Sequence, residues 1–365
     1  MKKRLILTGG HAATTAVAVV QEIKSENKDW SLYWIGVKNA IEGKKIVTLE
    51  SEVLPRLGVK FLPLIMGRIQ RKFTFWTIPS ILKIPFGFIQ SFYYLAKIRP
   101  NLILSFGGFA SFPVVFVAKL FRIPVVIHEQ TSAAGRANIV ASKFAEKITL
   151  SRKESVKFFE GISTEVIGNP VMEEIRIIKY VKNDEPPVVY VTGGSRGSQS
   201  INLAIEKILK TLLSRYKVIH QTGGLDYLKF SAISQKLPQA LRDNYEVFVR
   251  VNPLEVAKIY SKASVIVSRS GANTVSEIMI AKIPAVLIPL PISYQNEQFK
   301  NAEIAKKWGI AKVILQNDLT PEKLLKAIEF QIENRYRIQS LLKSKKSQDF
   351  DASKKLVKIV GEYMK

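Results

Sequence analysis

The fold class can be predicted from the stretch Val188-Val189-Tyr190-Val191-Thr192, which runs into Gly193-Gly194-Ser195-Arg196-Gly197. Apolar side chains at almost every position predict a strand that is buried on both faces of a sheet. The small residues that follow permit a tight turn, and helical periodicity begins at Gln199. A buried strand, a glycine turn and a helix are typical of a doubly wound α/β domain with a parallel sheet.

The same pattern occurs once more, near the start of the chain. The stretch Arg4–Thr8 runs into Gly9-Gly10-His11 and then into a helical stretch over Thr14–Ile23. Further short apolar runs that we expect to be parallel strands are Leu102–Ser105, Pro124–His128, Lys217–Gln221, Val265–Ser268 and Ala285–Pro289. The charged, proline-bearing segment Lys182–Pro187 is a plausible linker between the two patterns. We therefore predict two Rossmann-like domains, 1–168 and 169–343, that face a cleft, and a C-terminal helix in 344–365 that could pack back on the first domain.

The composition excludes several classes of site. The 365 residues suffice for two domains with cores of their own. There is no cysteine, which rules out disulfides, thiol nucleophiles and zinc–thiolate sites, and three histidines are too few for a histidine-rich metal centre. The apolar run that starts at Leu5 stops at Gly9, which is too short for a signal peptide, so we expect a cytoplasmic protein.

The net charge of +25 indicates an anionic partner. Residues 53–128 contain no Asp or Glu, and Phe73–Ala96 is mostly apolar and aromatic, but Pro79, Pro85 and Gly87 interrupt it as a membrane span. We expect 61–96 to lie on an anionic membrane surface. The residues expected to contact lipid are Arg68, Arg71, Lys72, Phe75 and Trp76. The alternative is a buried helix with solvated lysines on its outer side.

The glycine turns are candidate phosphate sites, because backbone N–H groups at a helix N-terminus can bind phosphate oxygens. A third turn, Ser268–Glu277, again follows a predicted strand, and no turn is a complete dinucleotide or Walker motif. Ser195 and Arg196 offer a hydroxyl and a cation to a diphosphate, and the Glu277 carboxylate could hold a ribose diol. The alternative is that each turn needs glycine only for steric reasons. Glycine turns in both halves suggest one ligand that bridges the cleft.

Few residues could transfer a proton. His11 follows a glycine turn at the carboxyl end of a strand, where α/β active sites form, although it could also be a helix cap or a core residue. His128-Glu129-Gln130 ends another strand at the same predicted edge, whereas we expect His220 to be structural. The lone Asp-x-Asp sequence, Asp349-Phe350-Asp351, lies in a lysine-rich tail and is interpreted as a helix cap.

Eight segments in order resemble the MurG family of peripheral membrane glycosyltransferases, which convert lipid I to lipid II in peptidoglycan synthesis. The segments are Thr8–His11, Ser105–Ser111, Ile123–Gln130, Gly168–Val171, Gly193–Ser195, His220–Gly223, Ser268–Glu277 and Pro289–Pro291, the last followed by Gln298 and Asn301-Ala302. The resemblance implies a GT-B fold with an N-terminal domain that binds the acceptor and the membrane. It places UDP-N-acetylglucosamine mainly on the C-terminal domain.

The resemblance also implies an activity. An inverting enzyme would move N-acetylglucosamine from UDP-N-acetylglucosamine to lipid I, the polyprenyl-diphosphate-linked muramyl peptide, at the cytoplasmic face of the cell membrane. No cofactor, metal or nucleic acid is implied, since helix N-termini and cations can stabilise the leaving diphosphate. Two alternatives stay open: a related lipid glycosyltransferase with another acceptor, and a UDP-N-acetylglucosamine 2-epimerase, which shares the fold but needs carboxylate pairs and no membrane surface.

Particular residues take their expected roles from this resemblance. It assigns proton transfer to His11 and Glu129. The expected contacts with UDP-N-acetylglucosamine are Thr8, Gly9, Gly10, Thr131, Asn138, Gly194, Ser195, Arg196, Asn202, Arg269, Ala272, Asn273, Thr274, Val275, Ser276, Glu277 and Gln298. The chain departs from the family pattern at several of its motifs. Thr131 replaces an asparagine, Met172 replaces an arginine expected near the nucleotide sugar, and Arg196 could supply that lost cation.

Overall fold

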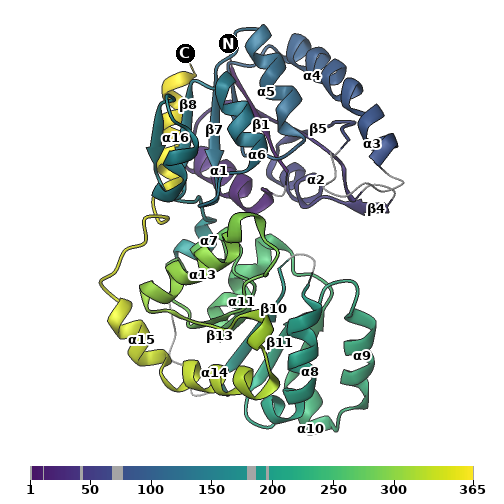
Figure 1. Ribbon diagram of the computed structural model, residues 1–365, viewed down its shortest axis with the longest axis vertical. Coiled ribbons are helices and arrows are strands. Elements are labelled where there is room, and N and C mark those ends of the chain that lie inside the picture. Colours follow the sequence, from purple (N-terminus) through teal and green to yellow (C-terminus); the bar gives the residue numbers. More distant parts are fainter. Residues whose placement is uncertain are drawn as a thin grey trace. The chain divides into compact units, whose positions relative to one another are not determined.

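The computed structural model describes residues 2–10, 12–41, 44–67, 77–178, 186–194 and 197–364. The chain forms two compact units, one from Met1–Glu173 with Gln348–Lys365 and the other from Glu174–Ser347 (Figure 1). Unit 1 extends past the expected boundary at 168 because it keeps the turn after its last strand, and the C-terminal segment rejoins unit 1 at Gln348 and not at 344. Within the described residues, no helix combines the length and apolarity that a membrane crossing requires.

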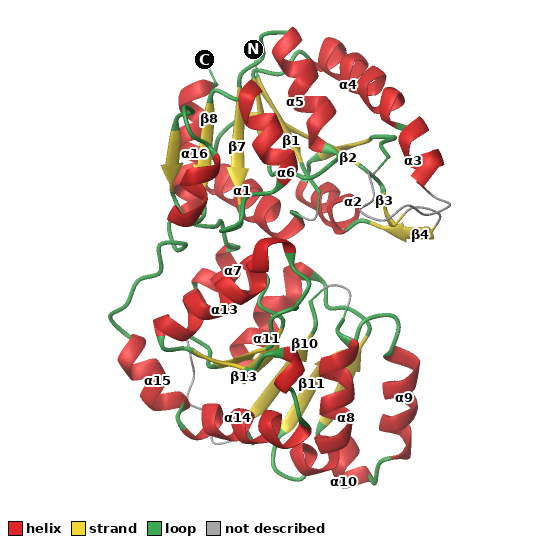
Figure 2. Ribbon diagram, in the orientation of Figure 1, coloured by secondary structure: helices red, strands yellow, loops and turns green. Residues whose placement is uncertain are grey.

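Unit 1 is built on a seven-stranded sheet in the order β5-β2-β1-β6-β7-β8-β9, in which every neighbouring pair is parallel (Figure 2). The strands are β1 (Lys3–Thr8), β2 (Trp30–Gly36), β5 (Lys60–Pro63), β6 (Leu102–Ser105), β7 (Val125–Glu129), β8 (Lys147–Leu150) and β9 (Thr164–Val166). The inner strand β1 is apolar on both faces, and Leu5, Ile6 and Leu7 are fully buried. The two short strands β3 (Asn39–Ile41) and β4 (Lys44–Val47) form a separate antiparallel pair.

Helices connect these strands. They are α1 (Ala13–Ser25), α2 (Leu49–Val53), α3 (Thr77–Leu82), α4 (Ile84–Ile98), α5 (Ser111–Leu120) and α6 (Arg136–Ala141). The short α7 (Glu173–Arg176) spans the boundary between the two units. Helix α1 buries Ala16, Val17 and Val20, which follow one another at helical spacing. The C-terminal helix α16 (Ala352–Tyr363) belongs to unit 1 and packs against α1.

Unit 2 repeats the plan with a six-stranded parallel sheet in the order β12-β11-β10-β13-β14-β15. The strands are β10 (Val188–Thr192), β11 (Lys217–Gln221), β12 (Tyr245–Phe248), β13 (Ala263–Ser268), β14 (Ala285–Leu287) and β15 (Ala311–Val313). The helices are α8 (Gln199–Leu213), α9 (Tyr227–Lys236), α10 (Gln239–Arg242), α11 (Val256–Lys262), α12 (Ala272–Ala281), α13 (Glu297–Trp308), α14 (Pro321–Glu333) and α15 (Arg335–Leu342). The prediction of two Rossmann-like parallel sheets is confirmed.

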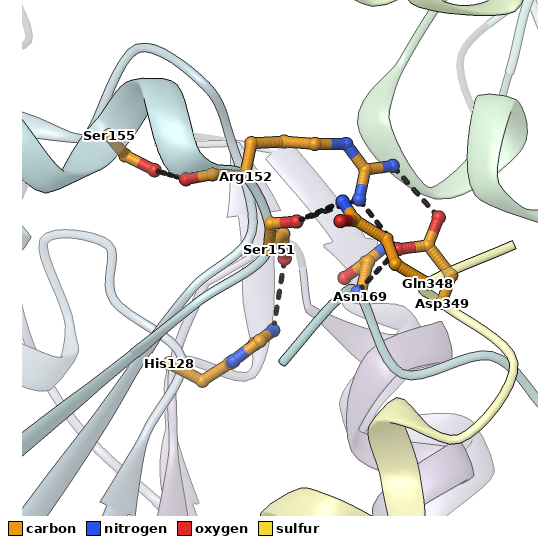
Figure 3. A network of polar contacts seen from close by, with 7 residues as sticks. All are labelled: His128, Ser151, Arg152, Ser155, Asn169, Gln348 and Asp349. Atoms are coloured by element: carbon orange, nitrogen blue, oxygen red, sulfur yellow. Dashed lines mark hydrogen bonds and ion pairs between the residues drawn. The ribbon is translucent and has the colours of Figure 1, made fainter. Parts of the chain in front are cut away.

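A buried ion pair fastens the returning C-terminal segment to unit 1 (Figure 3). Asp349 is fully buried, and its carboxylate accepts from Arg152 Nη1 at 2.5 Å and Nη2 at 2.8 Å. The backbone N–H of Asn169 also donates to Asp349 Oδ1 at 2.8 Å, and Gln348 Nε2 donates to the Ser151 carbonyl at 2.9 Å. The Asp349-Phe350-Asp351 sequence does precede a helix as expected, with Asp351 at the N-cap position of α16. Asp349 has a different role, because its carboxylate is bound by Arg152.

We expect Asp349→Ala to destabilise unit 1 by about 3–5 kcal/mol, because it leaves the Arg152 charge buried without its partner. The matched control is Glu165→Ala, which removes the half-exposed Lys147–Glu165 pair at 3.2 Å and should cost no more than about 1 kcal/mol. Hydrogen exchange of the α1 and α16 amides under native conditions measures both effects locally. Equal protection in the two variants would contradict a stabilising role for the buried pair.

Candidate functional site

In unit 1 the turns after β1 and β6 lie against each other at the carboxyl edge of the sheet. The Gly10 N–H donates to the Gly107 carbonyl at 2.9 Å, and a Cβ on Gly108 would stand only 3.0 Å from Gly10 N. The Thr8 hydroxyl is buried and donates to the Ile35 carbonyl at 2.8 Å. The first turn of α1 is fixed by Glu50, whose buried carboxylate accepts from the Ala12 N–H at 2.8 Å.

The Glu129 carboxylate organises the loop between β7 and α6. Oε1 accepts from the N–H and the hydroxyl of Thr131, both at 2.9 Å. Oε2 accepts from the Gly135 N–H at 2.9 Å and from Asn138 Nδ2 at 2.8 Å. Glu129 is 2% exposed, so these four donors surround a carboxylate that water barely reaches. The geometry is that of a side chain that holds a loop in place.

Asn138 joins this loop to the glycine turn after β6. A Cβ on Gly107, whose φ is +80°, would stand 2.4 Å from Asn138 Oδ1, so only glycine fits against the amide. Among the described residues, Asn138 Oδ1 has no hydrogen-bond partner although it is buried. A buried amide oxygen of this kind favours a ligand that brings a donor.

In unit 2 the glycine turn after β10 is tied to the two neighbouring loops by Gln221. Its Nε2 donates to the Gly194 carbonyl at 2.7 Å, and its Oε1 accepts from the Val251 N–H at 3.1 Å. Asn202 of α8 donates to the Thr222 carbonyl at 2.9 Å and to Asp226 Oδ2 at 2.7 Å. Both side-chain amides are nearly buried, so they fix the loops against one another.

His220 has the structural role expected of it. Its ring lies within hydrogen-bond distance of the Tyr245 hydroxyl and of Asn202 Oδ1, both at 3.0 Å, and burial lowers its pKa to about 3. His128 is also fully buried, with Thr149 Oγ1 at 2.9 Å and Ser151 Oγ at 3.3 Å, and burial likewise lowers its pKa to about 3. Both imidazoles are therefore neutral at physiological pH.

Arg269 connects the third turn to its surroundings. Its Nη2 donates to Gln316 Oε1 at 2.6 Å and to Ser200 Oγ at 2.8 Å, and Nη1 donates to the Ile288 carbonyl at 3.2 Å. Half-burial lowers the pKa of the guanidinium below its ordinary value. Gln298 lies beside it on α13, where its Oε1 accepts from the Leu290 N–H at 3.0 Å and its carbonyl accepts from Ser270 Oγ at 2.7 Å.

Helix α12 begins directly after the third turn, with Gly271 at its N-cap position. Ala272, Asn273 and Thr274 form its half-buried first turn, while Val275, Ser276 and Glu277 are buried. Glu277 Oε2 accepts from the Tyr260 hydroxyl at 3.0 Å. Burial raises the pKa of this carboxyl to about 7, because few polar groups replace the water that it loses.

The structure thus gathers the predicted site residues at two sheet edges, one in each unit. His11, Ser195 and Arg196 lie outside the described residues, as do the expected lipid contacts Arg68, Arg71, Lys72, Phe75 and Trp76. Sequence reasoning missed Glu50, Gln221 and Tyr260. Only Gln221 had a signal, since it follows His220 in a segment of the family pattern. Within the described residues, no cluster of three or more His, Asp or Glu side chains forms a candidate metal site.

Comparison with known proteins defines the class. Residues 7–150 match the glycosyltransferase family 28 N-terminal domain, and residues 188–358 match its C-terminal domain. The chain is a two-domain glycosyltransferase with the GT-B fold. A relative from Caldanaerobacter subterraneus subsp. tengcongensis is 31% identical over 97% of this chain and 96% of its own length. A relative from Borrelia garinii subsp. bavariensis is 31% identical over 100% of this chain and 98% of its own.

Both relatives are named UDP-N-acetylglucosamine–N-acetylmuramyl-(pentapeptide) pyrophosphoryl-undecaprenol N-acetylglucosamine transferase. This chain belongs to the MurG family, as its motifs predict. Among solved structures, MurG from Acinetobacter baumannii has a TM-score of 0.68 at 23% identity and covers 99% of each chain. A UDP-GlcNAc 2-epimerase from Neisseria meningitidis, bound to UDP-GlcNAc, has a TM-score of 0.65 at 15% identity and covers 99% of this chain and all of its own. These likenesses show the fold.

We expect Gly197→Ala to destabilise unit 2 more than Gly194→Ala does. Both glycines have positive φ, +76° and +79°, so both variants carry backbone strain. A Cβ on Gly197 would also stand 2.0 Å from the Thr222 carbonyl oxygen, whereas none of the described atoms lies within 4 Å of one on Gly194. Overpacking of this kind costs about 1–3 kcal/mol. Chemical denaturation of the two variants measures the difference, and equal unfolding free energies would contradict the close approach.

Proposed function

We propose that this chain transfers N-acetylglucosamine from UDP-N-acetylglucosamine to lipid I, which is undecaprenyl-diphospho-MurNAc-pentapeptide, and so forms lipid II in peptidoglycan synthesis. The observation that carries the proposal is similarity at 31% identity over nearly the whole chain to relatives named for this reaction. The glycine turns, the start of α12 and the Glu277 carboxylate in unit 2 support it, since each suits a part of a UDP-sugar.

Unit 2 would bind the donor. The N-terminus of α12 presents backbone donors and the positive end of a helix dipole, which favour a diphosphate. Ser195, Arg196 and Gly194 would complete the diphosphate site, Glu277 would accept from the ribose diol, and Gln298 would contact the sugar. As the glycosidic bond to UDP breaks, these donors stabilise the negative charge that develops on the leaving diphosphate.

Unit 1 would hold the acceptor and the general base. His11 follows Gly9-Gly10 in sequence and would take the proton of the acceptor hydroxyl as its oxygen bonds to the anomeric carbon and UDP departs. We propose that Glu129 positions the loop through Thr131 and Asn138 instead of transferring a proton, because each of its oxygens already accepts two hydrogen bonds.

The transferase and the epimerase differ in what they need besides UDP-N-acetylglucosamine. We expect purified protein to release UDP only when lipid I is present, and His11→Ala to lower kcat by about 10²-fold or more with UDP affinity nearly retained. The control is Tyr216→Phe, which lies just before β11 at the edge of the unit 2 sheet opposite the glycine turns and should leave kcat unchanged. Conversion of UDP-N-acetylglucosamine to its 2-epimer without any lipid would overturn the proposal.

Unit 1 also carries an exposed apolar surface, which we call the α3–α4 face. It consists of Ile78, Ile81, Leu82, Phe86, Ile89, Phe92 and Tyr93, each about half exposed or more. These positions recur at helical spacing, and the Phe92 ring lies 4.9 Å from that of Phe121 at the end of α5. Lys83, Lys97 and Arg99 border the face, and no acid occurs between 53 and 128. We propose that this face rests on the anionic cytoplasmic surface of the membrane as a peripheral attachment.

We expect Ile89→Glu with Phe92→Glu to abolish flotation with vesicles of phosphatidylglycerol and phosphatidylcholine. The matched control is Leu341→Glu, because Leu341 of unit 2 is 66% exposed and Ile89 is 65% exposed. Wild type should be released by salt, since the Debye length falls from ~10 Å at 0.1 M to ~3 Å at 1 M. Flotation of the double variant at the level of the control would contradict this membrane surface.

A further inference from the structure

Tyr260 is the side chain that holds Glu277. It lies on α11, its hydroxyl donates to Glu277 Oε2 at 3.0 Å, and it is 2% exposed. Among the described residues, no other side chain or backbone group donates a hydrogen bond to the Glu277 carboxylate. One oxygen is therefore fixed from within the protein, and Oε1 is the one left for a ligand.

The Tyr260 ring is itself held by a second buried tyrosine. Tyr190 of β10 packs edge-on against it, with the ring centroids 6.1 Å apart and the planes at 60°. The Tyr190 hydroxyl donates to Gln221 Oε1 at 3.2 Å, and Gln221 Nε2 donates to the carbonyl of Gly194 in the glycine turn. A continuous buried chain of contacts thus runs from the turn after β10 to the carboxylate on α12.

The hydrogen bond from Tyr260 also affects the ionisation of the Glu277 carboxyl. Burial raises the pKa of Glu277, and the hydrogen bond from Tyr260 opposes that rise because it stabilises the carboxylate. Within the part of the chain that the structure describes, Tyr260 and Tyr190 interact electrostatically with Glu277, and both stay neutral because burial raises the pKa of each hydroxyl. Removal of the Tyr260 hydroxyl should therefore raise the pKa of Glu277 further.

We propose that Tyr260 is a positioning residue for the nucleotide: it clamps one oxygen of Glu277 so that the other faces the ribose diol of the UDP moiety. The proposal rests on the proposed function, because it assumes that Glu277 binds the ribose. The phenol ring of Tyr260 is buried and packs against Tyr190 of β10, so its hydroxyl has little freedom to turn away from the Glu277 carboxylate. A carboxylate oriented in advance loses less conformational entropy when the diol binds.

The test compares UDP with 2′-deoxy-UDP by titration calorimetry, in wild type and in Tyr260→Phe. Wild type should prefer UDP by about tenfold or more, the worth of a hydrogen bond to a charged group. Tyr260→Phe should lose most of that preference while 2′-deoxy-UDP binds nearly as before. The control is Tyr216→Phe, which removes the hydroxyl of a nearly buried tyrosine just before β11, at the other edge of the sheet. It should keep the full preference.

Two further measurements separate positioning from a merely structural role. The preference for UDP should fall as pH drops through about 7 in wild type, and Tyr260→Phe should shift this fall to higher pH. The titration of the diphosphate cancels in the ratio, since both ligands carry it. In a Glu277→Ala background, Tyr260→Phe should have no additional effect on the ratio, because the residue acts through Glu277.

The outcomes distinguish the two proposals. If wild type shows no preference for UDP, the assignment of Glu277 to the ribose fails. A second outcome is that wild type prefers UDP over 2′-deoxy-UDP, Glu277→Ala abolishes this preference and Tyr260→Phe retains it in full. In that case the positioning role of Tyr260 fails and the proposed function stands. Should Tyr260→Phe not fold, Glu277→Asp serves instead, because it keeps the charge but withdraws the carboxylate from Tyr260. Full discrimination by Glu277→Asp would likewise overturn the clamp.

Discussion

Burial of a parallel sheet on both faces is the constraint from which this structure follows. Parallel neighbours cannot be joined by a hairpin, so each strand returns through a crossover that usually contains a helix. Every strand then ends at the same edge, and the helix that follows points its unsatisfied N–H groups there. The apolar strands β1 and β10, each followed by glycines, place such an edge in each unit, and the candidate site residues lie at those two edges.

Loops at such an edge have little secondary structure of their own, and a few polar side chains order them. Glu129, Gln221 and Arg269 each join backbone or side-chain groups from separate segments. The burial of these side chains is tolerable because their hydrogen-bond partners in the protein replace the hydrogen bonds that water would supply. Glu277 differs from these three side chains, because among the described residues only Tyr260 donates a hydrogen bond to its carboxylate. The Glu277 carboxylate can therefore accept further hydrogen bonds, and a ligand with two neighbouring hydroxyls could donate them.

The sequence predicts the fold well because the relevant signals are local. Alternation of apolar runs, glycine turns and helical stretches identifies β1, β10 and β13 and the start of α12, and the position of Glu277 follows from spacing alone. Contacts between distant residues leave no such local pattern. Arg152 and Asp349 are 197 residues apart, so the sequence around Asp349 gives no sign of their ion pair. Tyr260 escapes notice for the same reason, since it acts on Glu277, which lies 17 residues further along the chain on α12.

The fold alone does not separate the two enzyme classes, because UDP-GlcNAc 2-epimerases match this chain as well as MurG from Acinetobacter baumannii does in TM-score. The difference lies in unit 1. A 2-epimerase acts on a water-soluble sugar nucleotide, so it gains nothing from the exposed Ile78, Ile89 and Phe92, which lie in the stretch 53–128 that contains no Asp or Glu. Large apolar residues in solvent are a liability unless they bind something. Under the proposed function, an acceptor whose polyprenyl chain stays in the bilayer would supply that reason, because the enzyme would have to come to the membrane to reach it.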